Sequence, residues 1–594
     1  MTLEQTLKQA TVEIFNQQFN ATISPEAVTI NITNADHEGD YTIVVFPLVR
    51  VSKKSPEQTA ELLGNALIEK TNVIAKFNVI KGFLNLTLTD SYWLQRLQNI
   101  AENASFGTFP ANGQKVVLEY CGPNTNKPLH IGHLRNMLLG YSSSEILKAA
   151  GYDVTKVNIY NDRGIAICKS MVAYTRYANA ATPQSTGIKG DHFMGDWYVK
   201  FNEIVTEEIK ALPNAPTDKD EAQKLTPIFK EAQELLLKWE AGDPETVALW
   251  KKMNDWVYEG FHETFKLLGV DFQKDYYESE TYKLGRDLVN EGLEKNVFFK
   301  RKDGAVAVDL TPEGLDEKVL LRADGTSIYI TQDLATAKLR HEEFDMDKMI
   351  YVVANEQDYH FKVLKLALQK LGYKWADGIY HLSYALVESP TGRFKSREGK
   401  TADADDLIAE VLRIAEEKTK ELGKIEGFTA EEASTLYRTI GLGALKYFVL
   451  RVNPYKKIIF NPEESIDFHG HTGPFIQYTN ARIAAIMRKA GGAVTMSADV
   501  IAAYSLSEVE RELIILMSEY ENVVKAAAEK YDPSEIANYA YNLARTYNKF
   551  YHESPILSAP TENEKQVRVA LSGETGVIIK KAMKLLGIDV PEKM

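Results

Sequence analysis

The pattern of apolar and polar positions changes several times along the chain, and each change predicts a different kind of element. An amphipathic helical pattern opens the chain, and an apolar–polar alternation typical of a strand begins at Tyr41. A helix start follows at Ser55, and residues 78–88 carry a second strand pattern. Residues 1–110 therefore predict an α+β unit, which ends in a linker rich in Gly and Pro at residues 106–114.

A strand, a loop and a helix then follow one another in the order of a βαβ unit. Residues 115–120 predict an apolar strand, and a loop leads from it into a helix that ends before Gly151. A second strand is predicted at residues 153–160. Because parallel strands joined through a helix are typical of nucleotide-binding sheets, this order predicts a Rossmann-type parallel sheet. Further strands are expected at residues 305–310, 327–331 and 348–353.

Helical periodicity dominates the remainder of the chain. Residues 190–270 are mostly helical in pattern and acidic, which we interpret as an insertion in the sheet domain with a solvated outer face. Residues 431–594 show helical periodicity almost throughout, with no convincing strand, and predict an all-α helical bundle. The predicted fold class is therefore α/β. A Rossmann-type parallel-sheet domain at residues 111–430 would lie between an N-terminal α+β domain and the C-terminal bundle.

Composition places the chain among ordinary large globular proteins. It has 594 residues, of which 44% are apolar and 25% charged, and this excludes a disordered chain, a collagen-like fibre and a membrane bundle. Cys121 and Cys168 are too few for a disulfide framework or a structural zinc site, so we expect a reducing compartment and no protein-bound structural metal. A signal peptide and long apolar runs are both lacking, which predicts a cytoplasmic protein with no membrane contact.

The charge of the chain is unevenly placed. The net charge of −13 argues by itself against a nucleic-acid partner. However, residues 203–245 hold eleven acidic and five basic side chains, whereas residues 437–491 hold eight basic and three acidic ones. Tyr and Phe interleave with the basic residues of the second segment, a pattern that favours stacking on unpaired RNA bases. Most of these aromatic side chains are nonetheless expected in the core of the bundle.

The most informative segment is the loop and helix start that follow the first predicted strand of the parallel sheet. His130 and His133 flank Gly132 there, where backbone N–H groups and the helix dipole favour an anion. The imidazoles can donate hydrogen bonds to phosphate oxygens as charge builds during attack at an α-phosphorus. Gly132 leaves room for a flat ring to lie against the main chain. A zinc pair is the alternative, but no third ligand lies nearby and the helical i, i+4 spacing is absent.

Residues 130–133 read His-Ile-Gly-His and resemble the first signature of class I aminoacyl-tRNA synthetases. The same spacing occurs in cytidylyltransferases, which stay an alternative together with other class I synthetases and a tRNA-binding paralogue that no longer catalyses. Residues 119–135 resemble the arginyl-tRNA synthetases more specifically, as do the segments that begin at Tyr329 and Tyr351. The resemblance covers nearly the whole chain and is weakest at residues 200–250.

The resemblance implies an amino-acid site around Glu119, Asn124, Tyr329, Asp333 and Gln357. A guanidinium is a planar fork of hydrogen-bond donors that suits carboxylate and carbonyl acceptors. Asp333 and Glu119 supply the anions, and Tyr329 can stack or accept a hydrogen bond. Alternatively, Tyr329 packs at a strand end and Asp333 caps a helix start, which are routine structural roles.

The second class I signature, which stabilises the ATP phosphates in this family, has its counterpart in a basic segment that begins at Arg393. This segment departs from the family pattern, since Arg393 stands for the first lysine and Ser396 occupies the position of the second. Lys395 and Arg397 keep the positive charge, and Lys127 is a candidate substitute for the missing lysine. The alternative is a solvated basic turn.

The reaction that the resemblance implies has two steps. The arginine carboxylate would attack the α-phosphorus of MgATP, and the arginyl group would then pass from the adenylate to the 2′-hydroxyl of the terminal adenosine of tRNA(Arg). Rate would come from positioning and electrostatics, with Mg²⁺ carried by ATP offsetting phosphate charge. The residues expected in catalysis are His130, Gly132, His133, Lys127, Lys395 and Arg397. The residues expected to contact ATP are His130, Gly132, His133, Arg393, Lys395 and Ser396.

The resemblance also implies where tRNA binds. Residues 472–483 and the tail from Leu585 resemble the anticodon-binding domain of the arginyl family, and the N-terminal unit resembles the additional domain that contacts the D loop. We expect a monomer whose substrates are tRNA(Arg), L-arginine and ATP. The expected tRNA-binding residues are Arg451, Lys456, Tyr478 and Arg482.

Overall fold

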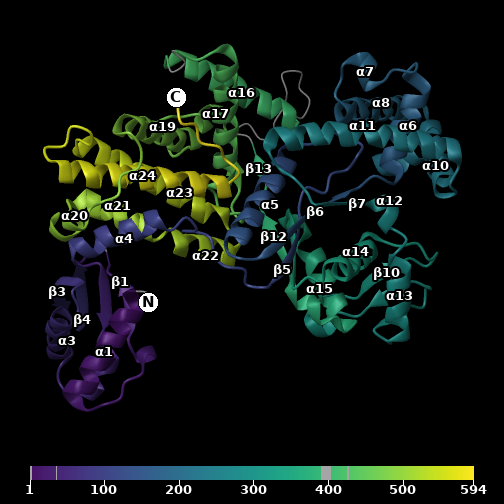
Figure 1. The fold of residues 1–594 in the computed structure, drawn as a ribbon. Coiled ribbons are helices and arrows are strands. Elements are labelled where there is room, and N and C mark those ends of the chain that lie inside the picture. Colours follow the sequence, from purple (N-terminus) through teal and green to yellow (C-terminus); the bar gives the residue numbers. More distant parts are fainter. Residues whose placement is uncertain (1–2, 35, 214, 389–402, 424–426) are drawn as a thin grey trace. The chain divides into compact units, whose positions relative to one another are not determined.

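The structure is a computed structural model that describes residues 3–34, 36–213, 215–388, 403–423 and 427–594 (Figure 1). The chain forms two compact units. The first comprises Met1–Phe106, Ile483–Tyr520 and Arg545–Ile578, and the second comprises Gly107–Arg482, Glu521–Ala544 and Ile579–Met594. Three helices contribute residues to both units, namely α19 (Gly473–Ala490), α23 (Pro533–Glu553) and α24 (Glu562–Leu585). The domain boundaries expected near residues 110 and 430 stay predictions.

The first unit contains a small antiparallel sheet with the strand order β1-β2-β4-β3. Helix α3 (Pro56–Lys70) packs on it and against α1 (Leu3–Phe19). Helix α3 starts where predicted: the Ser55 hydroxyl accepts a hydrogen bond from the Gln58 N–H at 3.2 Å, and the Gln58 side chain accepts one from the Ser55 N–H. The predicted α+β character of the N-terminal part is confirmed. The strands are β1 (Thr29–Ile32), β2 (Tyr41–Val44), β3 (Ile74–Ile80) and β4 (Phe83–Leu88).

Two of the predicted strand patterns in this unit extend beyond the strands that form. Residues 78–88 form a hairpin rather than one strand, because Lys81 and Gly82 adopt left-handed backbone angles, with φ of 48° and 81°, that reverse the chain. The alternation that begins at Tyr41 stops at Val44, and helix α2 (Phe46–Ser52) follows. Pro47 lies in its first turn, where the missing N–H leaves no helical hydrogen bond unmade.

The second unit is built on a five-stranded sheet with the order β12-β11-β5-β6-β7, in which every adjacent pair is parallel. Helix α5 (Ile131–Ala149) connects β5 to β6 and packs on the sheet. This is the predicted parallel α/β fold. All five strands run the same way, so their carboxyl ends form one edge, where ligands bind in sheets of this type. The strands are β5 (Lys115–Glu119), β6 (Asp153–Tyr160), β7 (Lys274–Tyr277), β11 (Lys348–Ala354) and β12 (Ile379–Tyr384).

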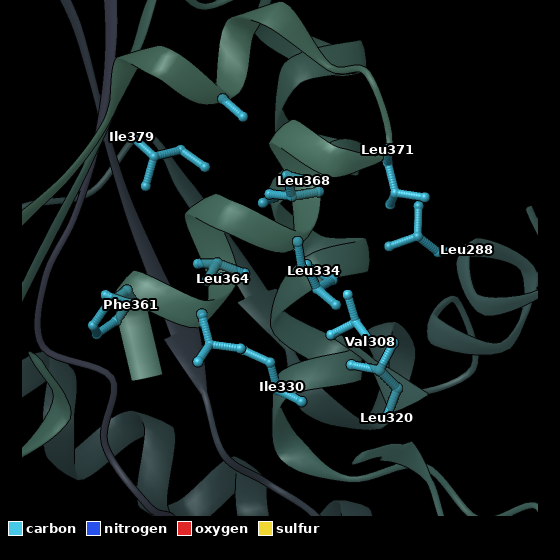
Figure 2. Packing of buried hydrophobic residues seen from close by; sticks show 14 of the residues in the cluster. Leu288, Val308, Leu320, Ile330, Leu334, Phe361, Leu364, Leu368, Leu371 and Ile379 are labelled. Atoms are coloured by element: carbon cyan, nitrogen blue, oxygen red, sulfur yellow. The ribbon is translucent and has the colours of Figure 1, made fainter. Parts of the chain in front are cut away.

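The strand predicted at residues 327–331 is wrong, because helix α14 begins at its centre and covers Tyr329–Phe344. Ile330, Leu334 and Ala337 are buried at helical spacing in the cluster of Figure 2, which also contains side chains of α15 (Asp358–Lys370). The short apolar run looked like a strand because only the following turns reveal the period of 3.6. This packing fixes the first turn of α14.

The strand predicted at 305–310 is β9 (Val306–Val308), which lies in a separate antiparallel sheet with β8 (Phe298–Lys300) and β10 (Lys318–Leu321).

A group of helices follows β6 and carries the acidic segment. Its core contains Phe201, Ile228 and Phe229, whereas the acidic side chains of the segment lie mostly at the surface. Helix α8 packs against α6 and α11. The main helices are α6 (Ile165–Tyr177), α8 (Gly190–Ala211), α10 (Pro227–Glu240) and α11 (Pro244–Leu268).

Helices also dominate the chain after residue 403. Strand β14 (Ile458–Ile459) is an exception that the helical periodicity did not predict, because its partner β13 (Val387–Glu388) lies far away in the sequence. No helix among the described residues is long and apolar enough to cross a membrane. The larger helices here are α16 (Ala404–Glu421), α17 (Ala430–Leu450) and α22 (Tyr520–Lys530), beside the three shared between the units.

Candidate active site

The two signature histidines cap the first turn of α5 and contact each other. Nδ1 of His130 accepts a hydrogen bond from the Gly132 N–H at 3.1 Å, and Nδ1 of His133 accepts one from the His130 N–H at 3.1 Å. The two ring centroids lie 3.9 Å apart. Because each Nδ1 is an acceptor, the neutral rings carry their proton on Nε2, the nitrogen that remains available to donate. Both imidazoles can therefore donate through Nε2, and the phosphate contact expected of them stays a prediction.

Burial keeps both imidazoles neutral. It lowers the pKa of His130 to about 4, with a further contribution from the charge of Lys127, and it lowers the pKa of His133 as well. Gly132 has a more local role than the predicted space for a ligand ring. A Cβ at this position would lie 2.9 Å from Cε1 of His130, so a side chain would push the imidazole out of its capping position.

The predicted arginine-binding residues do not all lie in one place. Glu119, at the end of β5, is already paired with the Arg340 guanidinium, which is wholly buried and stacks over the Tyr276 ring at 4.8 Å. Burial raises the pKa of Glu119, although the Arg340 charge opposes this. Oδ2 of Asp333 lies 2.6 Å from Nε2 of His360. Sequence reasoning missed Arg340 because a buried cation inside a helix shows no motif.

A cavity of about 1520 Å³ opens beside the carboxyl ends of the strands and receives three of the predicted residues. Asn124, Lys127 and Tyr329 line it, and Tyr329 is 79% exposed. Glu119, Asp333, Gln357 and the two signature histidines lie outside its lining. Its volume exceeds that of ordinary small-molecule pockets of about 300–1000 Å³, so it has room for more than one small substrate.

Several charged residues of this cavity were missed by sequence reasoning, among them Arg163 and Glu278. Arg163 follows β6 and Glu278 follows β7, so both lie just beyond the carboxyl ends of neighbouring parallel strands. Burial raises the pKa of Glu278 to about 7, because the Arg163 charge does not outweigh the combined effect of burial, Asp162 and Asp333. The carboxyl end of the strand predicted at residues 153–160 was the signal that could have found Arg163. Glu278 gave no such signal, because β7 was not among the predicted strands.

The predicted second signature, with Arg393, Lys395, Ser396 and Arg397, lies outside the described residues. The described chain resumes at Asp403, which forms an isolated antiparallel bridge with His130. The next N–H, of Ala404, donates to the Leu129 carbonyl at 2.8 Å.

The four predicted tRNA-binding residues differ in exposure. Arg451 is half-buried, stacks over Phe448 at 4.5 Å and donates a hydrogen bond to the His471 carbonyl. Burial lowers its pKa. The Arg482 guanidinium lies 5.1 Å from the Tyr478 ring, and both side chains are half-buried. Lys456 is the exposed residue of this set.

Three family models match the chain, and together they span most of its length. They are described as "tRNA synthetases class I (R), catalytic domain" at residues 96–462, "DALR anticodon binding domain" at residues 476–594 and "Arginyl tRNA synthetase N terminal domain" at residues 1–88. The parallel sheet, the histidine pair and these matches define a class I aminoacyl-tRNA synthetase, a class that uses ATP for activation.

Similar proteins show which amino acid this class I synthetase uses. Proteins named arginine–tRNA ligase from Parabacteroides distasonis and Bacteroides thetaiotaomicron are each 50% identical to the chain over the full length of both proteins. The chain belongs to the arginyl-tRNA synthetase family and is an arginine–tRNA ligase. The arginyl-tRNA synthetase structure from Thermus thermophilus has the same fold, with a TM-score of 0.79 at 24% identity and full coverage of both chains. The arginyl-tRNA synthetase of Plasmodium falciparum gives 0.74 at 17% identity, covering 100% of this chain and 99% of that one.

Proposed function

We propose that this chain joins L-arginine to tRNA(Arg) in two steps at the cavity and the adjoining start of α5. In the first step the arginine carboxylate attacks the α-phosphorus of ATP, and pyrophosphate leaves. In the second step the 2′-hydroxyl of the terminal adenosine attacks the arginyl carbonyl, and AMP leaves. Mg²⁺ enters with ATP as part of the substrate.

The reciprocal histidine cap is the observation that carries the phosphate-binding part of this proposal. Two neutral imidazoles with Nε2 protons lie beside the N–H groups of a helix start, so they stabilise negative charge on a phosphate without a net charge of their own. Lys127, which lines the neighbouring cavity, adds a cation close in sequence to the histidine pair. Lys395 and Arg397 are proposed to assist on the phosphates, and Arg393 and Ser396 to contact ATP.

The amino-acid part of the proposal assigns the guanidinium to Asp333 and Tyr329. Asp333 is partly exposed, and Tyr329 presents its ring to the cavity one helical turn earlier. Asn124 and Gln357 are proposed to hold the α-amino and carboxylate end of arginine. Glu119 is proposed to act through Arg340, since its carboxylate already binds that guanidinium.

The partner part of the proposal places tRNA on the basic and aromatic segment that contains Arg451, Lys456, Tyr478 and Arg482. The exposure of Lys456 supports a direct phosphate contact.

We further propose that the enzyme is a monomer in the cytoplasm. Cys121 and Cys168 are both free and buried, which is compatible with a reducing compartment. Sedimentation of the purified protein with and without tRNA tests the oligomeric state.

Arginine-dependent exchange of labelled pyrophosphate into ATP, with and without tRNA(Arg), tests the whole proposal. The resemblance implies that activation needs tRNA, so exchange is expected in its presence. Lysine in place of arginine serves as the control for amino-acid specificity. Lack of exchange with tRNA, arginine and MgATP together would contradict the proposed chemistry.

Glu278 is expected to make arginine activation pH-dependent. Its pKa of about 7 means that the carboxyl gains negative charge as the pH rises from 6 to 8, and this charge attracts the arginine cation. The value of kcat/KM for arginine should therefore rise across this range. Glu278→Gln should flatten the rise, whereas Asp287→Asn, which removes an exposed acid of the same cavity, should keep it.

The effect of Glu278 on folding has the opposite sign. A carboxyl whose pKa is raised in the folded state binds its proton more tightly there than in the unfolded chain. It therefore lowers the free energy of unfolding as the pH rises from about 4.5 towards 7. Thermal unfolding of the wild type and Glu278→Gln at pH 5 and pH 8 checks this: the variant should gain relative stability at the higher pH.

Lys456 is expected to contribute to tRNA binding and to leave the small-molecule sites unaffected. Lys456→Ala should weaken tRNA(Arg) binding by a few-fold and reduce the slope of log K against log salt by about 1. Lys457→Ala is a matched control, because the Lys457 amine is paired with Glu388 at 3.0 Å. Equal losses in the two variants would argue against a specific contact at Lys456.

A further inference from the structure

Asp405 ties the start of α16 to the helices that carry the acidic segment. Its Oδ2 accepts hydrogen bonds from Lys189 Nζ at 2.6 Å and His192 Nε2 at 2.8 Å. Its Oδ1 accepts one from the Thr264 hydroxyl at 2.9 Å. Lys189 and His192 lie at the start of α8, and Thr264 lies in α11. One carboxylate therefore has three donors from two helices.

The same turn contacts the first signature on its other side. The Ala404 N–H donates to the Leu129 carbonyl at 2.8 Å, and Asp403 forms the backbone bridge with His130. The Asp403 side chain caps α16 by accepting from the Asp406 N–H at 2.8 Å. The turn 403–405 thus lies between the helices α8 and α11 and the main chain that orients the His130 imidazole.

The Asp405 cluster has the composition of a metal site, but a cation of the protein already fills it. Asp191, His192 and Asp405 bring their ligand atoms within 4.8 Å of one another. The Lys189 ammonium lies 2.6 Å from Asp405 and 3.2 Å from Asp191, and it also donates to Thr264 at 2.7 Å. The cluster is therefore internally neutralised, which favours a mechanical role over ion binding.

We propose that Asp405 is a positioning residue for ATP. Through Lys189, His192 and Thr264 it holds the turn 403–405, and this turn holds the Leu129–His130 backbone and with it the direction of the His130 Nε2 proton. The inference rests on the proposed role of His130 in binding phosphate. It also assigns a function to the helices around the acidic segment, which orient the ATP site mainly through Asp405. The Asp403 carboxylate adds a contact, 3.3 Å from Nδ1 of His192.

The protonation of His192 supports this arrangement. Burial lowers the pKa of His192, but the hydrogen bond to Asp405 and the charges of Asp191 and Asp403 outweigh it, so the pKa is raised above 6.5. Lys189 and Glu263 are the other charged groups that line this cluster. A His with a raised pKa contributes stability at low pH that is lost as the pH rises through the folded value. The hold on Asp405 therefore weakens as the pH rises through the raised pKa of His192.

The test compares Asp405→Asn with Asp406→Asn, which changes the exposed neighbouring acid. Pyrophosphate exchange in the presence of tRNA gives KM for ATP, KM for arginine and kcat, and thermal unfolding gives stability. Asp405→Asn should lower kcat/KM for ATP by about 10- to 100-fold, with KM for arginine nearly unchanged. Asp406→Asn should match the wild type. Thr264→Val removes a single hydrogen bond and should give a smaller change in the same direction, even if Asp405→Asn folds poorly.

Three further measurements separate positioning from general stability. Lys189→Met combined with Asp405→Asn should lose less than the sum of the two single variants, because both act through one contact. KM for ATP should rise in the wild type as the pH passes the raised pKa of His192, and this rise should be smaller in His192→Gln. Unchanged ATP kinetics in Asp405→Asn would overturn the inference. So would a loss of activity that only matches the fraction of unfolded protein and affects ATP and arginine alike. If His130→Asn also leaves ATP kinetics unchanged, the proposed phosphate role of His130 fails instead.

Discussion

Asp333→Asn is expected to abolish most arginine activation while leaving the fold intact. The substitution keeps the size of the side chain and an acceptor for His360, but it removes the negative charge proposed to pair with the substrate guanidinium. Loss of a charge-assisted pair in a closed complex costs about 2–3 kcal/mol, so kcat/KM for arginine should fall by roughly 100-fold. Pyrophosphate exchange at varied arginine concentration measures this loss.

The control for this experiment is Asp287→Asn, since Asp287 carries a negative charge in the lining of the cavity, whereas Asp333 lies outside that lining. A general electrostatic attraction of arginine into the cavity would lower kcat/KM to a similar extent in both variants. Selective loss in Asp333→Asn supports direct recognition. Activity of Asp333→Asn within a few-fold of the wild type would contradict the assignment of the guanidinium to Asp333.

The second large effect is expected at His130, where two substitutions separate capping from catalysis. His130→Asn keeps an acceptor for the Gly132 N–H but lacks the distal donor that Nε2 provides. It should fold normally and lose about 100- to 1000-fold in kcat for exchange, as expected when one donor to a developing charge is removed. His130→Gln places its amide near the Nε2 position, so it should recover part of this rate while losing about 1 kcal/mol of helix capping.

The pH dependence of stability and of kcat gives an independent check on the role of His130. The pKa of His130 is about 4 in the folded state and near 6.5 in the unfolded chain, so the folded state resists protonation. Its contribution to stability is present above pH 6.5 and is lost as the pH falls towards 4. Catalysis at pH 6–8 should therefore show no step from His130. The measurement is kcat against pH for the wild type and His130→Asn. If both profiles show a step at a histidine pKa, that step belongs to another residue.

The parallel sheet could be predicted from local patterns, whereas several boundaries could not. Residues 115–160 read as a strand, a loop, a helix and a strand because each element is longer than one period of its own pattern. Residues 327–331 are too short to distinguish a strand from the first turn of α14. Burial of Ile330 against partners distant in the sequence decided the outcome.

Some residues of the candidate site could likewise be predicted from local patterns, and others could not. His130, Gly132 and His133 are adjacent in the sequence, so their mutual geometry follows from a helix start that the pattern already predicts. Arg163 and Glu278 lie more than a hundred residues apart in the chain, and only the alignment of β6 with β7 brings both to the cavity. The pairing of Glu119 with Arg340 was equally invisible, because it depends on how α14 packs over β5.

The sequence by itself determined the fold class and the family and located the histidine signature, because these depend on local periodicity and on residues close together in the chain. The uneven charge also corrected the first conclusion from a net charge of −13, since binding depends on local rather than total charge. Only the tertiary structure decided which carboxylates are free. It paired Glu119 with Arg340, raised the pKa of Glu278 and placed Asp405 between α8, α11 and the His130 backbone. Desolvation and ion pairing depend on neighbours that folding brings from distant segments, and no local pattern records them.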